Sequence, residues 1–294
     1  MVFSIMGCNS KKPSEPKPVD VIIISGQSNG VGCTHSDCIS RSIGYSKYQE
    51  YMRGYPDIQI AYDCWTKDII NEQTVFYSQN TSKDDGFVKV MLGQGNSLAT
   101  FGPEIGIAEA NYEKRAGKLF LIKYACGASN LKDDWVKKDS PMYGRFVKYV
   151  KKQMENLKGM GYIPTIKAMC WMQGEGDSYE GYYNEYYDNT KEFVSSLREE
   201  FKELAGNKDF AFIDAAINNN ATLWQYYRKV NEAKQQFAEE SDNNIFIDTI
   251  AAGMHTNEEP FAEPDLAHYD SESQVLLGHL FSEAFEPFLM PLEE

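Results

Sequence analysis

Apolar runs of strand length alternate with amphipathic stretches of helix length along most of this 294-residue chain. The runs are continuously apolar, which is typical of parallel strands buried on both faces. This alternation predicts an α/β fold in which helices cover both faces of a mainly parallel sheet. The predicted strands are 19–25, 118–125, 165–172, 210–215 and 244–248, and the predicted helices are 103–116, 143–157, 182–204, 221–239 and 271–285.

One long segment, residues 33–100, interrupts the alternation. It is rich in Tyr, Asp, Gly, Ser and Gln, and its apolar pieces near 58–62 and 88–92 predict one or two further strands. A structureless loop of this length is unusual inside a compact domain and is usually functional, so we expect this excursion to wall a substrate site. Residues 19–290 are predicted to form a single domain, because a chain of this length can bury one large core.

The N-terminus has a different character from the rest of the chain. A short apolar piece ends in Gly7 and Cys8, and a stretch rich in Lys, Pro and Ser follows it. Residues 1–18 therefore predict a flexible tether, or the remnant of a bacterial lipoprotein signal in which Cys8 carries the lipid. The second alternative implies export to the bacterial periplasm or the cell surface with a lipid anchor at Cys8. The basic start of such a signal is missing, so an unstructured N-terminus is the other alternative.

Composition excludes several kinds of partner. A net charge of -14 opposes contact with nucleic acid, whose binding needs clustered Lys and Arg. The sequence contains no run of about 18 apolar residues, so it predicts no membrane-spanning helix. The six cysteines lack the paired spacing of a zinc site. Cys126 and Cys170 end predicted strands and are expected in the core, whereas Cys33, Cys38 and Cys64 lie in loop-like sequence, where one disulfide can form after export.

Three predicted strands end in small, polar, glycine-rich sequence, and in open α/β sheets ligands bind at these carboxyl ends. The three ends read SGQSNG, ACGASN and WMQGEGDS. In the first of them, Ser28 lies between Gly26 and Gly30, which permit a tight turn that presents a hydroxyl group. The spacing differs from the G-x-S-x-G elbow of α/β-hydrolases. A simple turn or helix-capping role is the alternative for Ser28.

A serine hydroxyl attacks a substrate only if a base removes its proton, and His268 is the strongest candidate for that base. Asp265 lies three residues before it in a polar turn. This spacing lets the carboxylate reach the imidazole Nδ1 and leaves Nε2 free as the base. The alternative is that Asp265 caps the turn and His268 is a surface side chain.

Five motifs, GQSNG, FGPEIGIA, ACGASNLKDDW, WMQGEGDS and DLAHYD…LLG, resemble the successive signature blocks of the SGNH-hydrolase superfamily. They are most similar to the sialate O-acetylesterase and acetylxylan esterase group of carbohydrate esterases, and they extend from residue 19 to about residue 278. The resemblance implies a three-layer α/β/α sandwich around a central, mainly parallel five-stranded sheet, as in SGNH and flavodoxin-like folds. It also implies a serine esterase that removes O-acetyl groups from an oligo- or polysaccharide and needs neither a metal nor an organic cofactor.

The resemblance implies a role for each catalytic candidate. Ser28 matches the nucleophile, His268 the base, and Asp265 the acid of the D-x-x-H block. Glu175 matches an important acid of the family. It is implied to orient His268, either in place of Asp265 or together with it. The alternative is that Glu175 only ties a strand end to a loop. Gly127 is implied to join the N–H of Ser28 in the oxyanion hole.

The remaining site residues are also assigned by the resemblance or by their neighbours. The side-chain amide of Gln173 is implied to be a third oxyanion donor. Gln27 and Asn29, which flank Ser28, and Trp135, which follows the second strand end, are predicted to contact the substrate. Two residues depart from the family pattern, because Gly30 stands where Met is common and Cys126 replaces a glycine. We expect the first change to loosen the pocket wall.

Two acidic residues in the blocks favour structural roles. Asp177 begins D-S-Y-E, which fits a helix capping box. Glu104 follows a proline suited to the first turn of a helix, where exposed N–H groups favour a carboxylate.

Two other functions compete with the acetylesterase prediction. A lipase or thioesterase of the same superfamily would need an apolar acyl channel, which the polar strand ends do not suggest. A carbohydrate-binding surface protein would not need Ser28, Asp265 and His268 together. The sequence does not indicate an oligomeric state.

Overall fold

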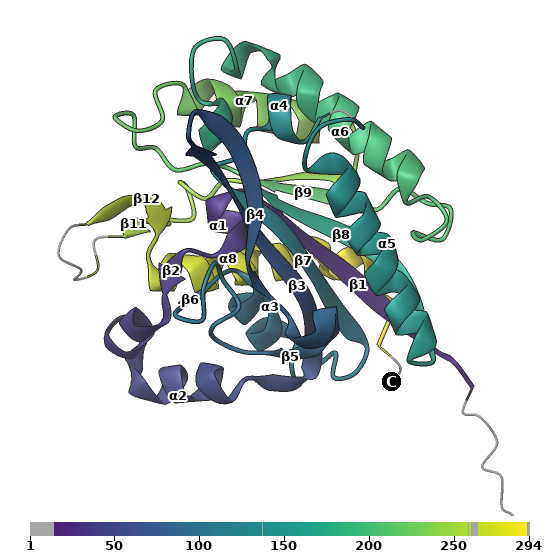
Figure 1. Cartoon of the computed structure of the whole chain (residues 1–294). Helices are drawn as coiled ribbons and strands as arrows, with labels where there is room; N and C mark the ends of the chain where they lie inside the picture. The colour runs from purple at the N-terminus through teal and green to yellow at the C-terminus, as the bar shows by residue number, and fades with distance from the viewer. Residues whose placement is uncertain (1–14, 137, 258, 260–263, 293–294) are drawn as a thin grey trace, which may run out of the picture.

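The computed structural model describes residues 15–136, 138–257, 259 and 264–292. They form three layers, with a sheet in the middle and helices against both of its faces (Figure 1). This arrangement confirms the predicted α/β/α sandwich. Within the same residues, no helix has the length and apolar character needed to cross a membrane. Cys8 and most of the predicted tether 1–18 lie outside the described residues.

The sheet is larger than the five strands predicted. Its order is β10-β9-β8-β1-β7-β3-β4, and β5 also pairs with β3. All five predicted strands are present and run parallel to their neighbours; β3, from the excursion, is a sixth parallel strand, and β4 and β5 pair with it in antiparallel fashion. The strands are β1 (Lys17–Gly26), β3 (Tyr55–Ile70), β4 (Gln73–Thr81), β5 (Val88–Val90), β7 (Leu119–Gly127), β8 (Tyr162–Met172), β9 (Ala211–Ala215) and β10 (Asn244–Ile247).

The central strands are apolar because helices cover both of their sides. Every residue of β1 from Val19 to Gly26 is buried between the neighbouring strands β7 and β8. At its end Gly26 has φ +134°, and a Cβ atom there would lie 2.0 Å from the carbonyl oxygen of Met172 on β8. Only glycine fits this contact. The polar segments that follow β1 and β8 are therefore held against each other.

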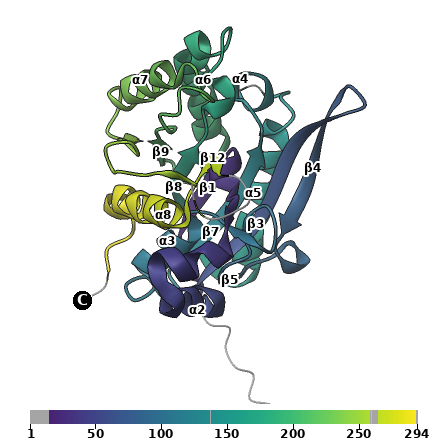
Figure 2. The ribbon, with the colours of Figure 1, turned by 90° about the vertical axis from the view of Figure 1, so that its left-hand side faces the viewer.

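The excursion contributes a hairpin that the sequence did not reveal. Beyond the sheet, β3 continues with β4 as a two-stranded ribbon that stands out from the body (Figure 2). Asn71 and Glu72 form its turn with φ of 52° and 65°, as two-residue hairpin turns require. Most residues of β4 are exposed, so it carries no apolar face that periodicity could detect.

The helices are α1 (Ser28–Val31), α2 (Tyr45–Arg53), α3 (Glu104–Asn111), α4 (Leu131–Asp134), α5 (Tyr143–Gly159), α6 (Tyr186–Glu200), α7 (Tyr227–Ala238) and α8 (Ser271–Phe285). In Figure 1, α5 lies in front of the sheet, and α3 and α8 pack together behind it. The prediction that a helix begins at residue 221 was wrong. The side-chain oxygen of Asn220 accepts hydrogen bonds from the N–H groups of Thr222 and Leu223, which holds this segment in turns until α7 begins.

Two short strand pairs lie outside the main sheet. They are β2 (Thr34–His35) with β6 (Thr100–Phe101), and β11 (Thr256–Asn257) with β12 (Asp265–Tyr269). The second pair carries His268 on β12, so this pair brings the predicted base to the polar carboxyl ends of the sheet strands.

The described cysteines are all unpaired, so the structure holds no disulfide among Cys33, Cys38 and Cys64, where the sequence had left one open. The Cys64 thiol is buried, with Sγ 3.6 Å from the carbonyl oxygen of Gln94. Cys126 and Cys170 are buried in the core, as predicted.

A buried lysine joins the excursion to the sheet. Lys123 on β7 and Glu104 at the start of α3 are both 0% exposed, and their charged groups lie 2.8 Å apart. The Lys123 ammonium also donates to the carbonyl oxygens of Val31 at 3.1 Å and Gln94 at 2.5 Å. Glu104 accepts a further hydrogen bond from the N–H of Gly102. The structural role predicted for Glu104 is confirmed, and its buried partner is an addition that the sequence did not indicate.

Replacing Lys123 by Met should lower the free energy of unfolding by about 3–5 kcal/mol, because the Glu104 charge would remain buried without its partner. Denaturant unfolding followed by circular dichroism measures this change. The double variant Lys123→Met with Glu104→Gln should recover part of the loss. As a control, Lys229→Met removes an exposed ion pair with Glu232 and should leave stability nearly unchanged. Equal effects of Lys123→Met and Lys229→Met would contradict this account of the fold.

Candidate active site

A hollow of about 550 Å³, which we call the active-site pocket, opens at the carboxyl ends of β1 and β7. Ser28, Gly127 and His268 all line it, so the structure brings these three predicted residues together. The excursion supplies part of its wall through Thr66 and Asn96, as the sequence led us to expect.

Ser28 is the first residue of the one-turn helix α1. The N–H of Gln27 donates to the Met172 carbonyl oxygen, which fixes the turn before the serine. The N–H of Ser28 itself meets no backbone acceptor among the described residues. Gly127 is its close neighbour, because a Cβ atom on Gly127 would lie 3.9 Å from the Cβ of Ser28. This arrangement leaves a hydroxyl and a free donor facing the pocket.

Neither departure from the family pattern alters the pocket. Gly30 is buried, and a side chain there would meet the carbonyl oxygen of Ser25 at 2.9 Å. The expectation that Gly30 loosens the wall was therefore wrong. Cys126 is buried in the core, next to Gly127 but away from the pocket lining.

His268 and Asp265 form a direct pair. Nδ1 of His268 lies 2.6 Å from Oδ2 of Asp265, while Oδ1 of Asp265 accepts from the N–H groups of Ala267 and His268. The hydrogen bond from His268 lowers the pKa of Asp265, so the carboxylate is ionised and can only accept. Nδ1 therefore carries a proton, and Nε2 is the nitrogen that acts as the base once the imidazole is neutral.

The surroundings of His268 act on its pKa in opposite directions. Burial by itself lowers the pKa, but the Asp265 carboxylate and the sulfur of Cys33 outweigh burial and raise the pKa to about 10. The pair is thus strongly stabilised in its charged form.

Glu175 does not contact His268 in the same way. It is fully buried, its Oε1 accepts from the Asn29 side-chain amide at 2.8 Å, and its Oε2 has no partner among the described residues. Burial raises its pKa, which favours the protonated form. The residue that orients His268 in this structure is Asp265, and Glu175 joins β8 to the turn after β1.

Asn29 was predicted to contact the substrate, and the structure places it elsewhere. It is 1% exposed. Its amide nitrogen donates to Glu175 and to the Ala267 carbonyl oxygen, and its side-chain oxygen accepts from the Tyr269 N–H at 3.1 Å. These last two bonds hold the backbone on both sides of His268. The prediction is corrected because every polar atom of the side chain is used inside the protein.

Gln173 does not supply the predicted third oxyanion donor. It is 0% exposed, and its amide nitrogen donates to Gln27 Oε1 at 3.2 Å and to Asp177 Oδ2 at 2.5 Å. Gln27 lines the pocket, but its Oε1 also accepts from the N–H groups of Gly174 and Gly176. Both glutamine side chains therefore fix the loop after β8.

Asp177 is structural, as predicted, but it does not cap its own helix. Its carboxylate accepts from the N–H groups of Leu131 and Lys132, the first residues of α4. Burial raises its pKa to about 6 in spite of these bonds. The acid thus ties the loop after β8 to the loop after β7.

The prediction that Trp135 contacts the substrate was also wrong. Trp135 is fully buried, packs edge-on against Trp171 and donates from Nε1 to Ser129. The aromatic residues that line the pocket are Tyr179 and Trp224. Their sequence neighbours give no reason to prefer them over the other aromatic residues of the chain.

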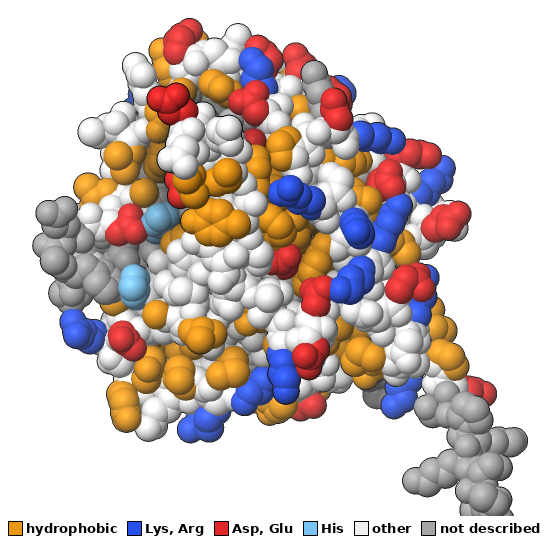
Figure 3. Space-filling view, viewed as in Figure 1, with side chains coloured by type: hydrophobic (Ala, Val, Ile, Leu, Met, Phe, Trp, Pro, Cys, Tyr) orange, Lys and Arg blue, Asp and Glu red, His pale blue; other side chains and the backbone are white. Residues whose placement is uncertain are grey.

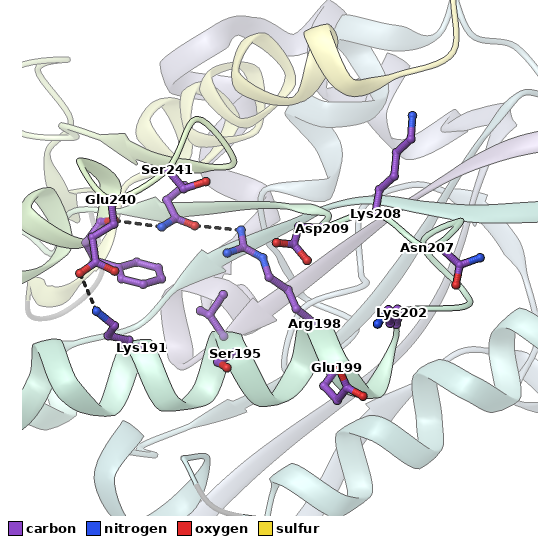
Figure 4. A pocket seen from close by; sticks show the side chains of 13 residues that line it. Lys191, Ser195, Arg198, Glu199, Lys202, Asn207, Lys208, Asp209, Glu240 and Ser241 are labelled. Atoms are coloured by element: carbon purple, nitrogen blue, oxygen red, sulfur yellow. Dashed lines mark hydrogen bonds and ion pairs between the residues drawn. The ribbon is translucent and has the colours of Figure 1, made fainter.

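Another hollow, of about 590 Å³, lies near the beginnings of β9 and β10, at the opposite end of the sheet (Figure 4). Lys191 is paired with Glu240 in this hollow. Arg198 donates to Asn244 and to two carbonyl oxygens. None of the predicted catalytic residues lines this hollow. In the described part of the chain, no three His, Cys, Asp or Glu side chains are grouped as a metal site needs.

Known proteins resemble this chain in sequence pattern and in fold. The family model described as "Carbohydrate esterase, sialic acid-specific acetylesterase" matches residues 18–286. No curated protein sequence gives a match. A solved structure of a protein from Arabidopsis thaliana has 21% identity and a TM-score of 0.61, with 93% of this chain and 100% of that chain covered. NanS has 13% identity and a TM-score of 0.57, with 93% and 98% covered. A carbohydrate acetylesterase from Xanthomonas citri has 12% identity and a TM-score of 0.56, with 92% and 56% covered.

Asn29→Ala should slow hydrolysis of p-nitrophenyl acetate by about 100-fold in kcat, because small displacements of a catalytic group cost about this much. The variant should also lose about 1–3 kcal/mol of stability. The loss of kcat should be larger than the fraction of unfolded protein can explain. Steady-state kinetics and denaturant unfolding on the same preparations measure the two effects.

Asn111→Ala is the matched control. Asn111 is also 1% exposed, and its side chain makes two hydrogen bonds, to the Ile107 carbonyl oxygen and to Ser282. This control should lose similar stability and keep its kcat. If both variants lose kcat equally, Asn29 has no special effect on His268.

Proposed function

The chain belongs to the carbohydrate esterase family of sialic acid-specific acetylesterases and is a hydrolase of carbohydrate acetyl esters, and we propose that Ser28 is its nucleophile and that its substrate is an O-acetylated neutral sugar. The observation that carries the proposal is one pocket lined by Ser28, Gly127 and His268, whose Nδ1 is paired with Asp265. A hydroxyl group, a base with its orienting acid, and backbone donors are the parts that acyl transfer needs.

The proposed reaction has two steps. Nε2 of His268 takes the proton of Ser28 Oγ, and Oγ attacks the acetyl carbonyl carbon. The N–H groups of Ser28 and Gly127 stabilise the oxyanion, a contribution of about 3 kcal/mol for each well-placed donor. His268 then gives the proton to the departing sugar oxygen. Water, activated by the same imidazole, releases acetate from Ser28. Asp265 stabilises the imidazolium in both steps.

The preference for a neutral sugar is supported by the charges around the pocket. No Lys or Arg is among the described residues that line it. Figure 3 shows many of the Lys and Arg side chains on the right of that view, over α5 and α6, and others along its lower edge. A sialic acid carboxylate is usually bound by Arg or Lys, most strongly in a bidentate pair. Acetylated xylan or a similar neutral polysaccharide therefore fits this pocket better than an O-acetylated sialic acid.

A long acyl chain fits the pocket poorly. Polar side chains such as Thr66, Gln79 and Asn96 line it together with Gln27. An acyl channel would instead be lined by apolar side chains over most of its length. This favours the acetyl ester over the lipase alternative.

Wild-type protein should release acetate from acetylated xylan and little from O-acetylated sialic acid. Ser28→Ala should lower the rate on xylan by about 10³-fold or more, because the covalent step is lost. Acetate is measured enzymatically, with circular dichroism to confirm folding.

Ser25→Ala serves as the control for this substitution. Ser25 lies on the same strand, is fully buried and donates to the Tyr124 carbonyl oxygen, so its loss should leave the rate nearly intact. Equal activity of Ser28→Ala and wild type would disprove the nucleophile. Faster release from sialic acid than from xylan would disprove the neutral substrate.

The pKa of His268 should be visible in solution. Protonated His268 cannot accept the Ser28 proton, so kcat/KM should rise as pH rises, with its midpoint well above the ordinary histidine value of 6.5. Asp265→Asn removes the carboxylate that raises this pKa, so the imidazole should titrate at lower pH. NMR titration measures both proteins, and the His268→Gln variant identifies the signal. An unchanged pKa in Asp265→Asn would contradict the assigned pair.

A further inference from the structure

A second hollow of about 420 Å³ adjoins the active-site pocket. Ala267 lines both cavities. Two consecutive residues of one turn also separate the cavities: Leu223 lines the second hollow, and Trp224 lines the active-site pocket. The two spaces therefore meet beside His268, across a ridge made by this turn and Ala267.

Tyr179 and Trp224 form what we call the aromatic wall of the active-site pocket. Their ring centroids lie 6.4 Å apart with an interplanar angle of 79°. The Tyr179 hydroxyl donates to the Leu223 carbonyl oxygen at 3.2 Å, and the backbone N–H of Trp224 donates to the Asn220 carbonyl oxygen at 2.7 Å. These bonds fix the wall to the turn. Tyr179 is 44% exposed, so a large ring surface is available to a ligand.

The aromatic wall also contains a polar group without a partner. Nε1 of Trp224 is buried, and no acceptor contacts it among the described residues. A buried indole N–H normally finds an acceptor. The nitrogen itself is closed off from the pocket, so a sugar would contact the aromatic wall through its ring surfaces.

The second hollow offers polar groups suited to hydroxyls. Asn220 uses its side-chain oxygen to hold the turn, which leaves its amide nitrogen without a hydrogen bond inside the described chain. The Thr222 hydroxyl likewise makes none there. The carboxylate of Asp265 also lines this hollow and would repel an acidic sugar.

We propose that the two cavities are neighbouring subsites for one neutral sugar chain. The acetylated unit lies against the aromatic wall beside Ser28, and the next unit crosses Ala267 into the second hollow. This inference rests on the proposed function, because Ser28 marks the acetylated unit. It adds that the enzyme acts on chains of at least two sugars and that Tyr179 and Trp224 determine its specificity.

Binding can be tested without turnover. Unacetylated xylotetraose should bind the full chain in titration calorimetry, and xylose should bind at least tenfold more weakly. Tyr179→Ala and Trp224→Phe should each weaken xylotetraose binding by about 10-fold or more, as expected for the loss of one well-packed contact. Trp224→Phe keeps an apolar ring in place, so the variant protects the fold.

Kinetics then separate this inference from the proposed function. On acetylated xylotetraose, each variant should lose at least tenfold more kcat/KM than it loses on p-nitrophenyl acetate. Tyr45→Ala is the control, because Tyr45 is 64% exposed and stacks on Tyr48 within α2, outside both cavities. It should change neither binding nor kinetics.

Each result has a defined meaning. Equal kcat/KM for acetylated xylose and acetylated xylotetraose, with Ser28-dependent hydrolysis intact, would overturn the subsites and leave the proposed function standing. Equal losses on both esters in Tyr179→Ala and Trp224→Phe would also overturn the subsites. Absence of hydrolysis would instead overturn the proposed function, and calorimetry would still decide the sugar-binding site.

Discussion

The buried ammonium of Lys123 links the parts of the chain that build the active site. It reaches Val31, at the end of the helix that begins with Ser28, Gln94 in the excursion, and Glu104 at the start of α3. A charge enclosed in this way is tolerated only when its partners have good geometry, because desolvation costs several kcal/mol for each ion. The position of α1 and the path of the excursion are therefore coupled to one strand of the central sheet.

A second layer of polar contacts fixes the base and the turns. The signature blocks contain more polar residues than the chemistry uses, and most of them bond to one another. Gln27 and Gln173 join the first and third strand ends, and Asn29 holds the backbone on both sides of His268. Buried polar groups need partners, so each loop can adopt its structure only when the others are in place. The pocket is thereby preorganised, with few groups left to face a substrate.

The sequence predicted the strands and the residues at their ends, because these depend on position along the chain. It did not predict which of those residues point into the pocket, because that depends on side-chain direction. Continuous apolar runs identified five sheet strands, and polar strand ends identified Ser28 and His268, because parallel strands deliver their ends to one edge. Gln173 and Trp135 also lie near that edge, yet both point inward, toward Asp177 and toward Trp171. Nothing in the local sequence of either residue indicates that direction. The turn that bears Trp224 was predicted as helix because its apolar spacing is helical. The side chain of Asn220 holds this segment in a turn, and that hydrogen bond leaves no trace in the spacing.

Asp265 connects the chemistry to the two cavities. One of its oxygens contacts His268, and the side chain also lines the second hollow, where it is 41% exposed. A sugar in that hollow would remove water from the carboxylate and so strengthen its interaction with the imidazolium, since charges attract more strongly in a low dielectric. Above the pKa of His268 the imidazolium forms only when Ser28 attacks, so binding of the neighbouring sugar would there favour the transition state more than the ground state. Remote binding energy would then appear in kcat and not only in KM.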